Sequence, residues 1–383
     1  MRLLIAGGGT GGHIYPALAV AEAVRQRAAD AELAWLGGHR GLEASIVREA
    51  GIPLRRLALR SLRSVERDVH LVLDPARLAV SVPQALAILA RDRPAAIFTT
   101  GGYVAIPTVL AARILGIPVL LWEGNLVPGR SVRAVARLVS AVAVTFASTC
   151  RALGRSSRCF ATGTPIRELA GIDRSGARER LGLPPGVKVV LVFGGSQAVR
   201  RLNDAVAAAI GQLVEDRVVI HVTGDDGYAA ALAGRERLPA AVRARYRPAP
   251  FLREEMADAL AAADLVVGRA GSSTLAEVTA LGLPIVVVPY PHAGGHQRGN
   301  AELLAKAGAA RLVEDDAFDA AALLAGSRLL DDEGATEAMR AASRALGRPG
   351  AAGAVADLLL ALARHEALPA PDVIERRAAG APA

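Results

Sequence analysis

Residues 2–24, RLLIAGGGTGGHIYPALAVAEAV, decide the fold of this chain. The mostly apolar residues 2–6 predict a strand, a glycine cluster follows, and Pro16 opens a run of Ala, Leu and Val with helical spacing. Gly7, Gly9 and Gly12 spell G-x-G-x-x-G. Glycines let a ligand approach the backbone closely, and the N–H groups at a helix start attract anions. The stretch therefore predicts a strand, loop and helix that bind a phosphate-bearing ligand.

The carboxylate of a dinucleotide-binding unit is missing from its expected place. In such units the second strand ends, about 20 residues after the glycines, in an acidic residue that holds the ribose hydroxyls. Here the predicted second strand, 32–36, is followed by Gly37-Gly38. His13 stands at the glycine loop instead, and an imidazole suits proton transfer near neutral pH. His13 is a candidate general base, although a helix cap or a hydrogen bond to a carbonyl explains it equally well.

Length and composition favour two globular α/β domains. The chain has 383 residues, of which 52% are apolar and 21% charged, enough for two separate cores. Aromatic residues make up only 3%, which argues against stacking platforms for single-stranded nucleic acid. Residues 1–163 carry 20 basic and 10 acidic side chains, a net charge of +10. Because the whole chain has a net charge of +8, residues 164–383 have a net charge of −2. This asymmetry favours a polyanionic partner, either nucleic acid or an anionic membrane surface.

Cysteine usage and hydropathy indicate the compartment. Cys150 and Cys159 form neither a C-x-x-C pair nor a metal-binding spacing, so we expect the reduced thiols of a cytoplasmic protein. The start of the chain lacks a charged segment followed by a long apolar one, so we expect no signal peptide. The uncharged run 94–112 has the length of a membrane span, but Gly101-Gly102 and Pro107 favour a strand, loop and helix there.

Strand and helix patterns alternate along the whole chain. This alternation predicts parallel sheets covered by helices on both faces, with binding residues at the carboxyl ends of the strands. The small and turn-forming residues 160–165, FATGTP, predict the interdomain linker. Residues 189–210, VVLVFGGSQAVRRLNDAVAAAI, then repeat the opening strand, Gly-Gly loop and helix. We expect the tail after His365 to fray. The predicted strands are 3–6, 33–36, 96–99, 118–121, 141–144, 218–222, 265–267 and 285–288, and the predicted helices lie near 16–27, 42–50, 75–91, 106–115, 131–139, 254–262, 274–281, 297–307 and 351–364.

Residues 268–277, GRAGSSTLAE, have the pattern of a nucleotide site. Two glycines permit close backbone approach, and Ser272, Ser273 and the free amides of a helix start can hold phosphate. Glu277 can accept hydrogen bonds from both hydroxyls of a ribose. The alternative is a capping box, because Thr274-x-x-Glu277 has that spacing too.

The loop 289–301, PYPHAGGHQRGNA, is rich in side-chain donors and acceptors. His292, His296, Gln297 and Asn300 in one short loop suit the hydroxyls of a sugar. Two histidines four residues apart also suggest a metal, but no third ligand is evident nearby and Gly294-Gly295 interrupts any helix.

Three further segments of the first part have polar residues at expected strand ends. Residues 100–103, TGGY, and 123–125, EGN, each follow a predicted strand and are expected to line the same cleft as His13. Arg167 can neutralise a diphosphate leaving group, although an isolated arginine is commonly a solvated surface residue. No D-x-D with apolar flanks is present, so the charge of a leaving group must be met by helix N-termini and arginine.

These segments together resemble the MurG family of bacterial peptidoglycan glycosyltransferases. The matching stretches are GGGTGGHIYPALAVA, TGGYVAIP, EGN, GTPIR, GGSQAVRRLN, RAGSSTLAEVTALGLPIVVVPYPHAGGHQRGNA and KAGAA, in the family's order from residue 7 to about residue 310. The resemblance implies a GT-B fold, in which two doubly wound Rossmann-like domains with parallel sheets face an interdomain cleft. It implies domains at 1–163, for the acceptor and the membrane, and 164–345, for UDP-GlcNAc, then a helix at 346–365 that packs back on the first domain and a flexible tail at 366–383.

The resemblance also implies a reaction and its residues. The reaction is inverting transfer of GlcNAc from UDP-GlcNAc to the C4 hydroxyl of the muramyl sugar of undecaprenyl-linked lipid I, which gives lipid II. It takes place at the cytoplasmic face of the membrane, on an anionic surface, with no metal, other cofactor or nucleic acid. His13 matches the family's proposed base and Glu277 its ribose ligand. The matched donor-site positions are Thr10, Gly11, Gly12, Asn125, Arg167, Ser196, Leu252, Ser272, Ser273, Thr274, Leu275, Ala276, Glu277 and Gln297.

The chain departs from the family pattern at three places. It reads Trp122-Glu123-Gly124-Asn125 where the family often has His-Glu-Gln-Asn, and His296 stands where some members have Gln. Residues 61–80 match poorly, and their apolar Leu71, Val72, Leu73 and Leu78 among arginines fit either peripheral membrane contact or an amphipathic helix packed on the sheet.

Two other functions remain open on the sequence. One is a GT-B transferase with another acceptor, such as a glycolipid or a natural-product aglycone. The other is a non-catalytic protein that binds a nucleotide-sugar or, through the basic first part of the chain, nucleic acid.

Overall fold

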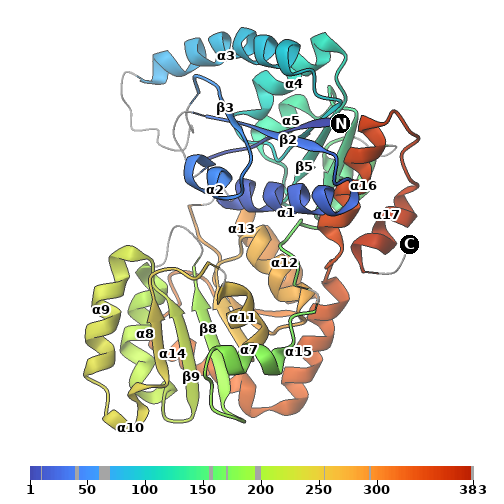
Figure 1. The fold of residues 1–383 in the computed structure, drawn as a ribbon. Helices are drawn as coiled ribbons and strands as arrows, with labels where there is room; N and C mark the ends of the chain where they lie inside the picture. The colour runs from blue at the N-terminus through green and yellow to red at the C-terminus, as the bar shows by residue number, and fades with distance from the viewer. Residues whose placement is uncertain are drawn as a thin grey trace. The chain divides into compact units, whose positions relative to one another are not determined.

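The computed structural model describes residues 1–9, 11–38, 43–59, 70–154, 158–169, 171–194, 200–253, 255–292 and 295–380. The chain forms two compact units, each with its own sheet. Unit 1 comprises Met1–Glu168 and Arg348–Ala383, and unit 2 comprises Leu169–Gly347 (Figure 1). The predicted class, two doubly wound parallel-sheet units, is confirmed.

Unit 1 is built on a parallel sheet with the strand order β3-β2-β1-β4-β5-β6-β7. The chain runs outward from β1 to β3 and then starts again at β4, on the other side of β1, so the point between β1 and β4 is the topological switch point of this sheet. The strands are β1 (Arg2–Ala6), β2 (Glu32–Gly37), β3 (Leu54–Arg56), β4 (Ala96–Thr99), β5 (Val119–Glu123), β6 (Ala141–Val144) and β7 (Cys159–Ala161). The helices are α1 (Gly11–Arg27), α2 (Glu43–Glu49), α3 (His70–Asp92), α4 (Ala105–Leu115), α5 (Arg130–Val135), α6 (Ala147–Ala152), α16 (Ala351–Ala363) and α17 (Pro371–Ala378).

Both faces of the unit 1 sheet are buried, because alternate strand residues point to opposite sides. Leu3 and Ile5 of β1 lie in the core with α1 and α16, whereas Leu4 and Ala6 lie in the core with α3, α4 and α5. Figure 1 shows these two helix layers on either side of the sheet. Burial on both faces explains why the strands read as continuous apolar runs.

Unit 2 repeats this architecture with the strand order β10-β9-β8-β11-β12-β13, so its switch point lies between β8 and β11. Its strands are β8 (Lys188–Phe193), β9 (Arg217–Val222), β10 (Tyr246–Ala249), β11 (Leu265–Gly268), β12 (Ile285–Val287) and β13 (Ala310–Leu312). Its helices are α7 (Arg174–Arg180), α8 (Arg200–Leu213), α9 (Asp225–Glu236), α10 (Ala240–Arg243), α11 (Glu255–Ala262), α12 (Ser272–Ala280), α13 (His296–Lys306), α14 (Ala320–Ser327) and α15 (Glu333–Leu346), with a short 3₁₀ turn at Arg328–Asp331.

The end of the chain returns to unit 1 and is ordered there. Val355, Leu358 and Leu359 of α16 are fully buried in the core that α1 covers, and Arg27 of α1 forms an ion pair with Asp357 at 2.9 Å. The segment after His365, which the sequence assigns to a frayed tail, instead contains α17, whose Ile374 is fully buried. That tail prediction was wrong because it weighed the Pro, Ala and charge content and missed the apolar face of α17.

One stretch, Glu333–Ala363, is long and apolar enough to cross a membrane, by length and composition alone. Half of its most apolar 18-residue segment is buried within the protein. The stretch consists of two helices, α15 in unit 2 and α16 in unit 1, separated by residues 347–350. The apolar composition of α16 is therefore that of a core helix. The run 94–112 is β4, a loop and most of α4, as predicted.

Two local predictions need correction. The predicted linker at 160–165 is not the boundary: Phe160 belongs to β7 and the core, Thr162 is fully buried, and the units divide between Glu168 and Leu169. Cys150 of α6 and Cys159 of β7 were expected as reduced thiols, but they form a disulfide, with Cα atoms 5.8 Å apart. The spacing excluded a metal motif but not this bond, because α6 folds back against β7.

Candidate active site

His13 lies at the switch point of the unit 1 sheet. Helix α1 begins at Gly11, so His13 stands in its first turn, directly after the glycine loop that leaves β1. Its Nδ1 is 2.8 Å from the carbonyl oxygen of Thr100, the residue that follows β4, and the Thr100 hydroxyl donates to the carbonyl of His13 at 3.1 Å. A carbonyl only accepts, so Nδ1 carries the proton and the ring lone pair lies on Nε2. The hydrogen bond to this carbonyl, which the sequence offered as an alternative to a catalytic role, therefore fixes the tautomer in which Nε2 can accept a proton.

Two glycines are required around this histidine. A methyl group on Gly7 would lie 2.8 Å from the hydroxyl oxygen of Thr100, which is closer than real contacts allow. Gly102 has φ +73°, and a methyl group there would lie 3.8 Å from Nε2 of His13. The glycines that the sequence assigned to ligand approach therefore also let the loops after β1 and β4 pack against each other around the imidazole.

Asn125 is held by the buried carboxylate of Glu123, a residue that the sequence pattern predicted only as part of the lining of the cleft. Glu123, only 4% exposed, accepts from the backbone N–H and the side-chain amide of Asn125, both at 2.9 Å, and from the N–H of Gly129 at 2.7 Å. Thr149 in α6 donates to the carbonyl of Asn125 at 3.2 Å. These bonds fix the loop after β5 at the same edge of the sheet as His13. Trp122, at a position where the family often has His, is fully buried and donates to the carbonyl of Gly163.

In unit 2, two helices begin at the ends of neighbouring strands without a side-chain cap. Helix α12 follows β11 with Gly271 as its N-cap, and α13 follows β12 with Gly295 as its N-cap. Asn300 of α13, fully buried, donates to the carbonyl of Ala270 and joins the two loops. Uncapped N–H groups at adjacent helix starts favour an anionic group.

The capping-box interpretation of Thr274 and Glu277 is wrong. In a capping box Thr274 would be the N-cap residue, but α12 begins at Ser272, so Thr274 is already its third helical residue. Glu277 lies one turn further on and is 9% exposed. The ribose-binding interpretation of Glu277 is therefore the one that stays a prediction.

Two buried polar atoms close to these helix starts have no hydrogen-bond partner within the described parts of the chain. They are the hydroxyl oxygen of Ser273 in α12 and Nδ1 of His296 in α13. A buried polar atom without a partner costs free energy, about 1–3 kcal/mol, unless a ligand or water satisfies it. Both atoms belong to segments that the sequence assigned to phosphate or sugar binding.

Other predicted residues have structural contacts of their own. Gln297 accepts from the N–H of Tyr290 at 2.9 Å through its side-chain oxygen, so it also fixes the loop after β12. Leu252 packs partly against the unit 2 core. Arg167 belongs to unit 1, three residues after the predicted start of the second domain at 164. Thr10 and Ser196 lie outside the described residues. Across the described residues no three histidine, cysteine or carboxylate side chains gather as metal ligands would, and His292 lies edge-on to Tyr290.

Sequence reasoning missed two polar clusters in unit 2. Arg269, 4% exposed, forms an ion pair with Asp315, donates to the carbonyl of Val288 at 3.2 Å and lies 5.4 Å from the centre of the Tyr290 ring. It therefore holds together the segments that follow β11 and β12. The available signal in the sequence was an arginine almost directly after the apolar strand 265–267. An arginine at such a place is expected to be buried, and buried arginines are rare unless they are paired.

The second cluster joins α8 to the sheet. His221 of β9 is within 2.9 Å of the Tyr246 hydroxyl at Nδ1 and 3.0 Å of the Asn203 side-chain oxygen at Nε2, and the Asn203 amide donates to the carbonyl of Thr223. The amide oxygen only accepts, so Nε2 donates to it and Tyr246 donates to Nδ1. Burial lowers the pKa of His221 from 6.5 to about 4 and raises the pKa of Tyr246 from 10.0 to about 12, so both stay neutral. The cluster fixes α8, whose start follows the second Gly-Gly loop.

Comparison with known proteins identifies the family. Residues 3–144 match the glycosyltransferase family 28 N-terminal domain, and residues 189–357 match the glycosyltransferase family 28 C-terminal domain. The UDP-N-acetylglucosamine–N-acetylmuramyl-(pentapeptide) pyrophosphoryl-undecaprenol N-acetylglucosamine transferase of Desulforudis audaxviator is 41% identical over 95% of this chain and 99% of its own. The enzyme of the same name from Moorella thermoacetica is 38% identical over 94% and 98%.

Solved structures agree with the sequence comparison. The crystal structure of Acinetobacter baumannii MurG is similar with a TM-score of 0.73 and 29% identity, covering 94% of this chain and 99% of that one. The calicheamicin glycosyltransferase CalG4, with a TM-score of 0.65 and 16% identity over 92% and 96%, shows the shared fold alone. The protein is thus a glycosyltransferase, and the chain belongs to glycosyltransferase family 28, among the MurG enzymes.

Proposed function

We propose that the protein transfers N-acetylglucosamine from UDP-GlcNAc to the C4 hydroxyl of the muramyl sugar of a polyprenyl-diphosphate-linked muramyl-pentapeptide, lipid I, and so forms lipid II. The observation that carries the proposal is similarity over nearly the full chain to relatives named for this transfer. We assign the acceptor to unit 1 and UDP-GlcNAc to unit 2, as the predicted domains 1–163 and 164–345 did, with the C-terminal segment added to unit 1.

The chemistry follows from the two switch points. The acceptor C4 oxygen attacks the anomeric carbon of GlcNAc, the bond from that carbon to the diphosphate oxygen breaks, and UDP leaves with the bonding electron pair. His13 Nε2 takes the C4 proton, in the tautomer that Thr100 fixes. A base so placed contributes about 10²–10⁴-fold in rate. Attack from the face opposite the leaving group inverts the anomeric configuration.

The leaving group needs stabilisation of its negative charge. We assign its diphosphate to the uncapped start of α12, with Ser272, Ser273 and Thr274, together with Arg167, Ser196 and the glycine loop at Thr10, Gly11 and Gly12. Glu277 accepts from the ribose hydroxyls, and Gln297 and Asn125 contact the sugar. Leu252, Leu275 and Ala276 complete the donor site. The mechanism that we propose uses no metal ion or other cofactor.

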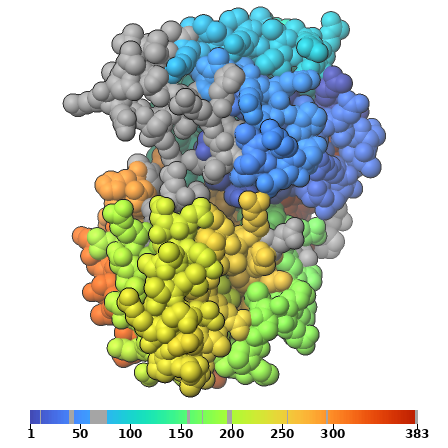
Figure 2. Space-filling view, turned by 60° about the vertical axis from the view of Figure 1, so that its left-hand side comes forward, coloured from blue at the N-terminus to red at the C-terminus, as the bar shows by residue number. Residues whose placement is uncertain are grey.

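We also propose that unit 1 binds peripherally to the cytoplasmic face of the membrane, at an anionic lipid surface. Of the large hydrophobic side chains exposed in the described residues, Phe251 alone lies in unit 2. Ile114 and Leu115 end α4, Leu138 follows α5 and Val80 lies on α3, and α3, α4 and α5 are neighbours on one side of the sheet. Figure 2 shows α3, in cyan, lying open on the surface of unit 1.

Basic residues accompany these apolar side chains. Arg113, Arg133 and Arg137 are exposed on α4, on α5 and just after α5. Apolar side chains among arginines favour contact with anionic lipid. Leu78 packs against the core, which agrees with the alternative prediction of an amphipathic helix packed on the sheet. Residues 61–69 lie outside the described residues, and the side chains of Leu71, Val72 and Leu73 are not described.

One reconstitution tests the proposed reaction. Purified protein is incubated with labelled UDP-GlcNAc and lipid I, and the lipid fraction is analysed for a disaccharide product. Formation of lipid II supports the proposal, and turnover of a simple glycoside with none of lipid I favours a different acceptor. Salt-dependent DNA binding without turnover would favour the nucleic-acid alternative.

Vesicle co-sedimentation tests the membrane assignment. Replacing both Ile114 and Leu115 with Glu is expected to weaken binding to anionic vesicles at least tenfold. The matched control is Phe251→Glu in unit 2, which is 51% exposed and is expected to bind vesicles as the unmodified protein does. Equal loss in both variants would contradict the assignment to unit 1.

A further inference from the structure

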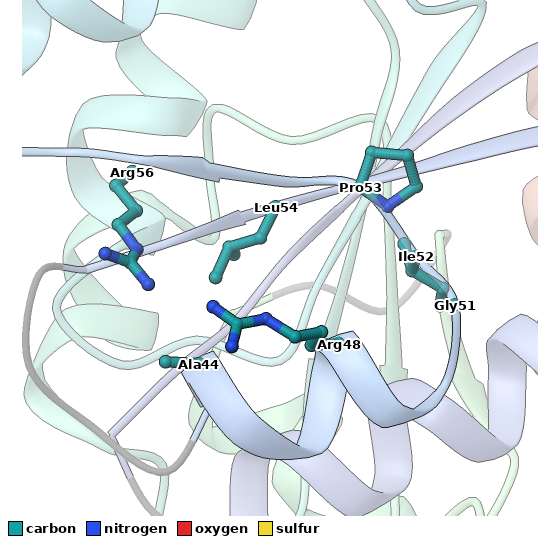
Figure 3. Close-up of a pocket in the computed structure, with 7 residues that line it drawn as sticks. All are labelled: Ala44, Arg48, Gly51, Ile52, Pro53, Leu54 and Arg56. Carbon is teal, nitrogen blue, oxygen red and sulfur yellow. The ribbon is translucent and has the colours of Figure 1, made fainter.

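A surface hollow of about 420 Å³ lies in unit 1 between α2 and β3 (Figure 3). Its lining consists of Ala44, Arg48, Gly51, Ile52, Pro53, Leu54 and Arg56, and none of these was singled out as a candidate site residue. Its volume is within the range of small-ligand pockets. Ile52, Pro53 and Leu54 make one wall apolar, and the two arginines supply its charge.

The two arginines converge on this hollow. Arg48 comes from the last turn of α2 and Arg56 from the end of β3, and Figure 3 shows their guanidinium groups turned toward each other beside Leu54. Within the described part of the chain neither has an ion pair, and no carboxylate lines the hollow. The neighbouring Arg55, in contrast, pairs with Asp92 at 3.3 Å. Two cations that face each other repel, so the arrangement favours an anion between them.

One end of the hollow, at Arg56, lies at the carboxyl edge of the sheet, whereas Gly51, Ile52 and Pro53 precede β3 and line the other end. Arg56 is the last residue of β3 and pairs in register with Gly37 of β2, whose preceding residue Leu36 pairs with Ala6 at the end of β1. β3 is therefore two strands from β1, about 10 Å away at the usual strand spacing. The glycine loop that leads to His13 leaves β1 at this same carboxyl edge.

We infer that Arg48 and Arg56 bind a carboxylate of the acceptor's peptide. The acceptor named for the relatives carries a pentapeptide on its muramyl sugar, and a peptide ends in a carboxylate. Five extended residues span up to about 17 Å, enough to reach from a sugar beside His13 to the hollow. The planar guanidinium fork matches the two oxygens of a carboxylate. The inference rests on the proposed function, because it needs the acceptor sugar at His13.

Two forms of a water-soluble, short-chain acceptor test the inference. One has free peptide carboxylates, and in the other every peptide carboxylate is amidated. The KM for each is measured at saturating UDP-GlcNAc. With the unmodified protein, amidation is expected to raise KM about three- to tenfold, the scale of one or two exposed charge pairs, and to leave kcat unchanged. In the double variant Arg48→Gln/Arg56→Gln, both acceptors are expected to show the higher KM.

Controls separate the specific effect from net charge. The variant Arg91→Gln/Arg158→Gln loses the same two charges at exposed positions of unit 1 and is expected to keep the preference for the free carboxylates. The variant Arg48→Lys/Arg56→Lys is expected to keep part of it. The KM for UDP-GlcNAc is expected to stay the same in all variants.

Each contrary result has a distinct meaning. Equal KM values for the two acceptors with the unmodified protein, or an unchanged preference in Arg48→Gln/Arg56→Gln, overturn the inference and leave the proposed function standing. No turnover of either acceptor by the unmodified protein overturns the proposed function itself. Loss of binding to anionic vesicles in Arg48→Gln/Arg56→Gln, with the preference intact, assigns the arginines to lipid phosphate and also overturns the inference.

Discussion

Protonation of His221 is expected to destabilise unit 2 as the pH falls. The ring is 1% exposed and is neutral in the folded protein, where Tyr246 and Asn203 use both of its nitrogens. Burial lowers its pKa from 6.5 to about 4. Below pH 6.5 the unfolded chain therefore binds a proton at this residue that the folded chain does not bind, and stability falls as the pH drops toward 4.

The size of the effect follows from the shift. At 1.36 kcal/mol for each pH unit, the interval from 6.5 to about 4 corresponds to a loss of about 3 kcal/mol in the free energy of unfolding. Carboxylates also titrate in this range, so the effect is isolated by comparison with His221→Gln, which is neutral at every pH. That variant is expected to lose about 1–2 kcal/mol near pH 7.5 through weakened hydrogen bonds. Because the unmodified protein loses about 3 kcal/mol by pH 4, the two stability curves are expected to cross, and the variant to be about 1–2 kcal/mol more stable at pH 4.

Denaturant unfolding at several pH values measures this difference. Both tryptophans, Trp35 and Trp122, lie in unit 1, so their fluorescence follows that unit while far-UV circular dichroism follows both. The expected loss of stability is confined to the unfolding transition of unit 2, which circular dichroism reports and tryptophan fluorescence does not. The matched control is His365→Gln, at an exposed position, which is expected to keep the original pH dependence. Stability curves of the unmodified protein and His221→Gln that stay parallel from pH 7.5 to 4 would refute the reasoning.

Three substitutions test the proposed catalytic and binding roles. His13→Ala is expected to reduce transfer by about 10²–10⁴-fold with the Kd for UDP-GlcNAc unchanged, and turnover near the original rate would remove the base assignment. Glu277→Ala is expected to weaken UDP binding about tenfold or more, as judged by calorimetry, since it removes a charged acceptor for the ribose hydroxyls; an unchanged Kd would contradict that role. Gly7→Ala is expected to lower kcat by displacing Thr100, because the new methyl group lies 2.8 Å from its hydroxyl; Thr100→Ala in the same chain is expected to restore part of the rate, and no rescue would argue against this clash.

The sequence predicts well where one local pattern determines the structure. The glycine loop after β1 and the alternation of strands and helices were predicted because glycine conformation and apolar periodicity are local properties. Most of the predicted strands agree with the structure to within a residue or two. The three-residue strands β3, β7 and β13 were missed, because so short a segment carries no periodicity, whereas β12 was predicted from the longer apolar run 285–288.

Contacts between distant segments were not predictable in the same way. The resemblance implied that the helix at 346–365 packs back on the first domain, and α16 does so, but nothing in residues 351–363 themselves says that the helix covers α1. The parallel pairing of β9 and β10 brings His221 and Tyr246 together, although 25 residues separate them. The spacing of a capping box is present, but the interpretation was wrong, because the N-cap of α12 is Gly271, three residues before Thr274.

The return of the last 36 residues to unit 1 has a consequence for synthesis on the ribosome. The helix that covers α1 is made only after the whole of unit 2 has been translated. During that interval the nascent first segment has its sheet but lacks Val355, Leu358 and Leu359, and the apolar face of α1 stays open to solvent. The second unit can therefore complete its fold before the first one, and a chain that stops short of residue 348 leaves the unit that contains His13 permanently uncovered.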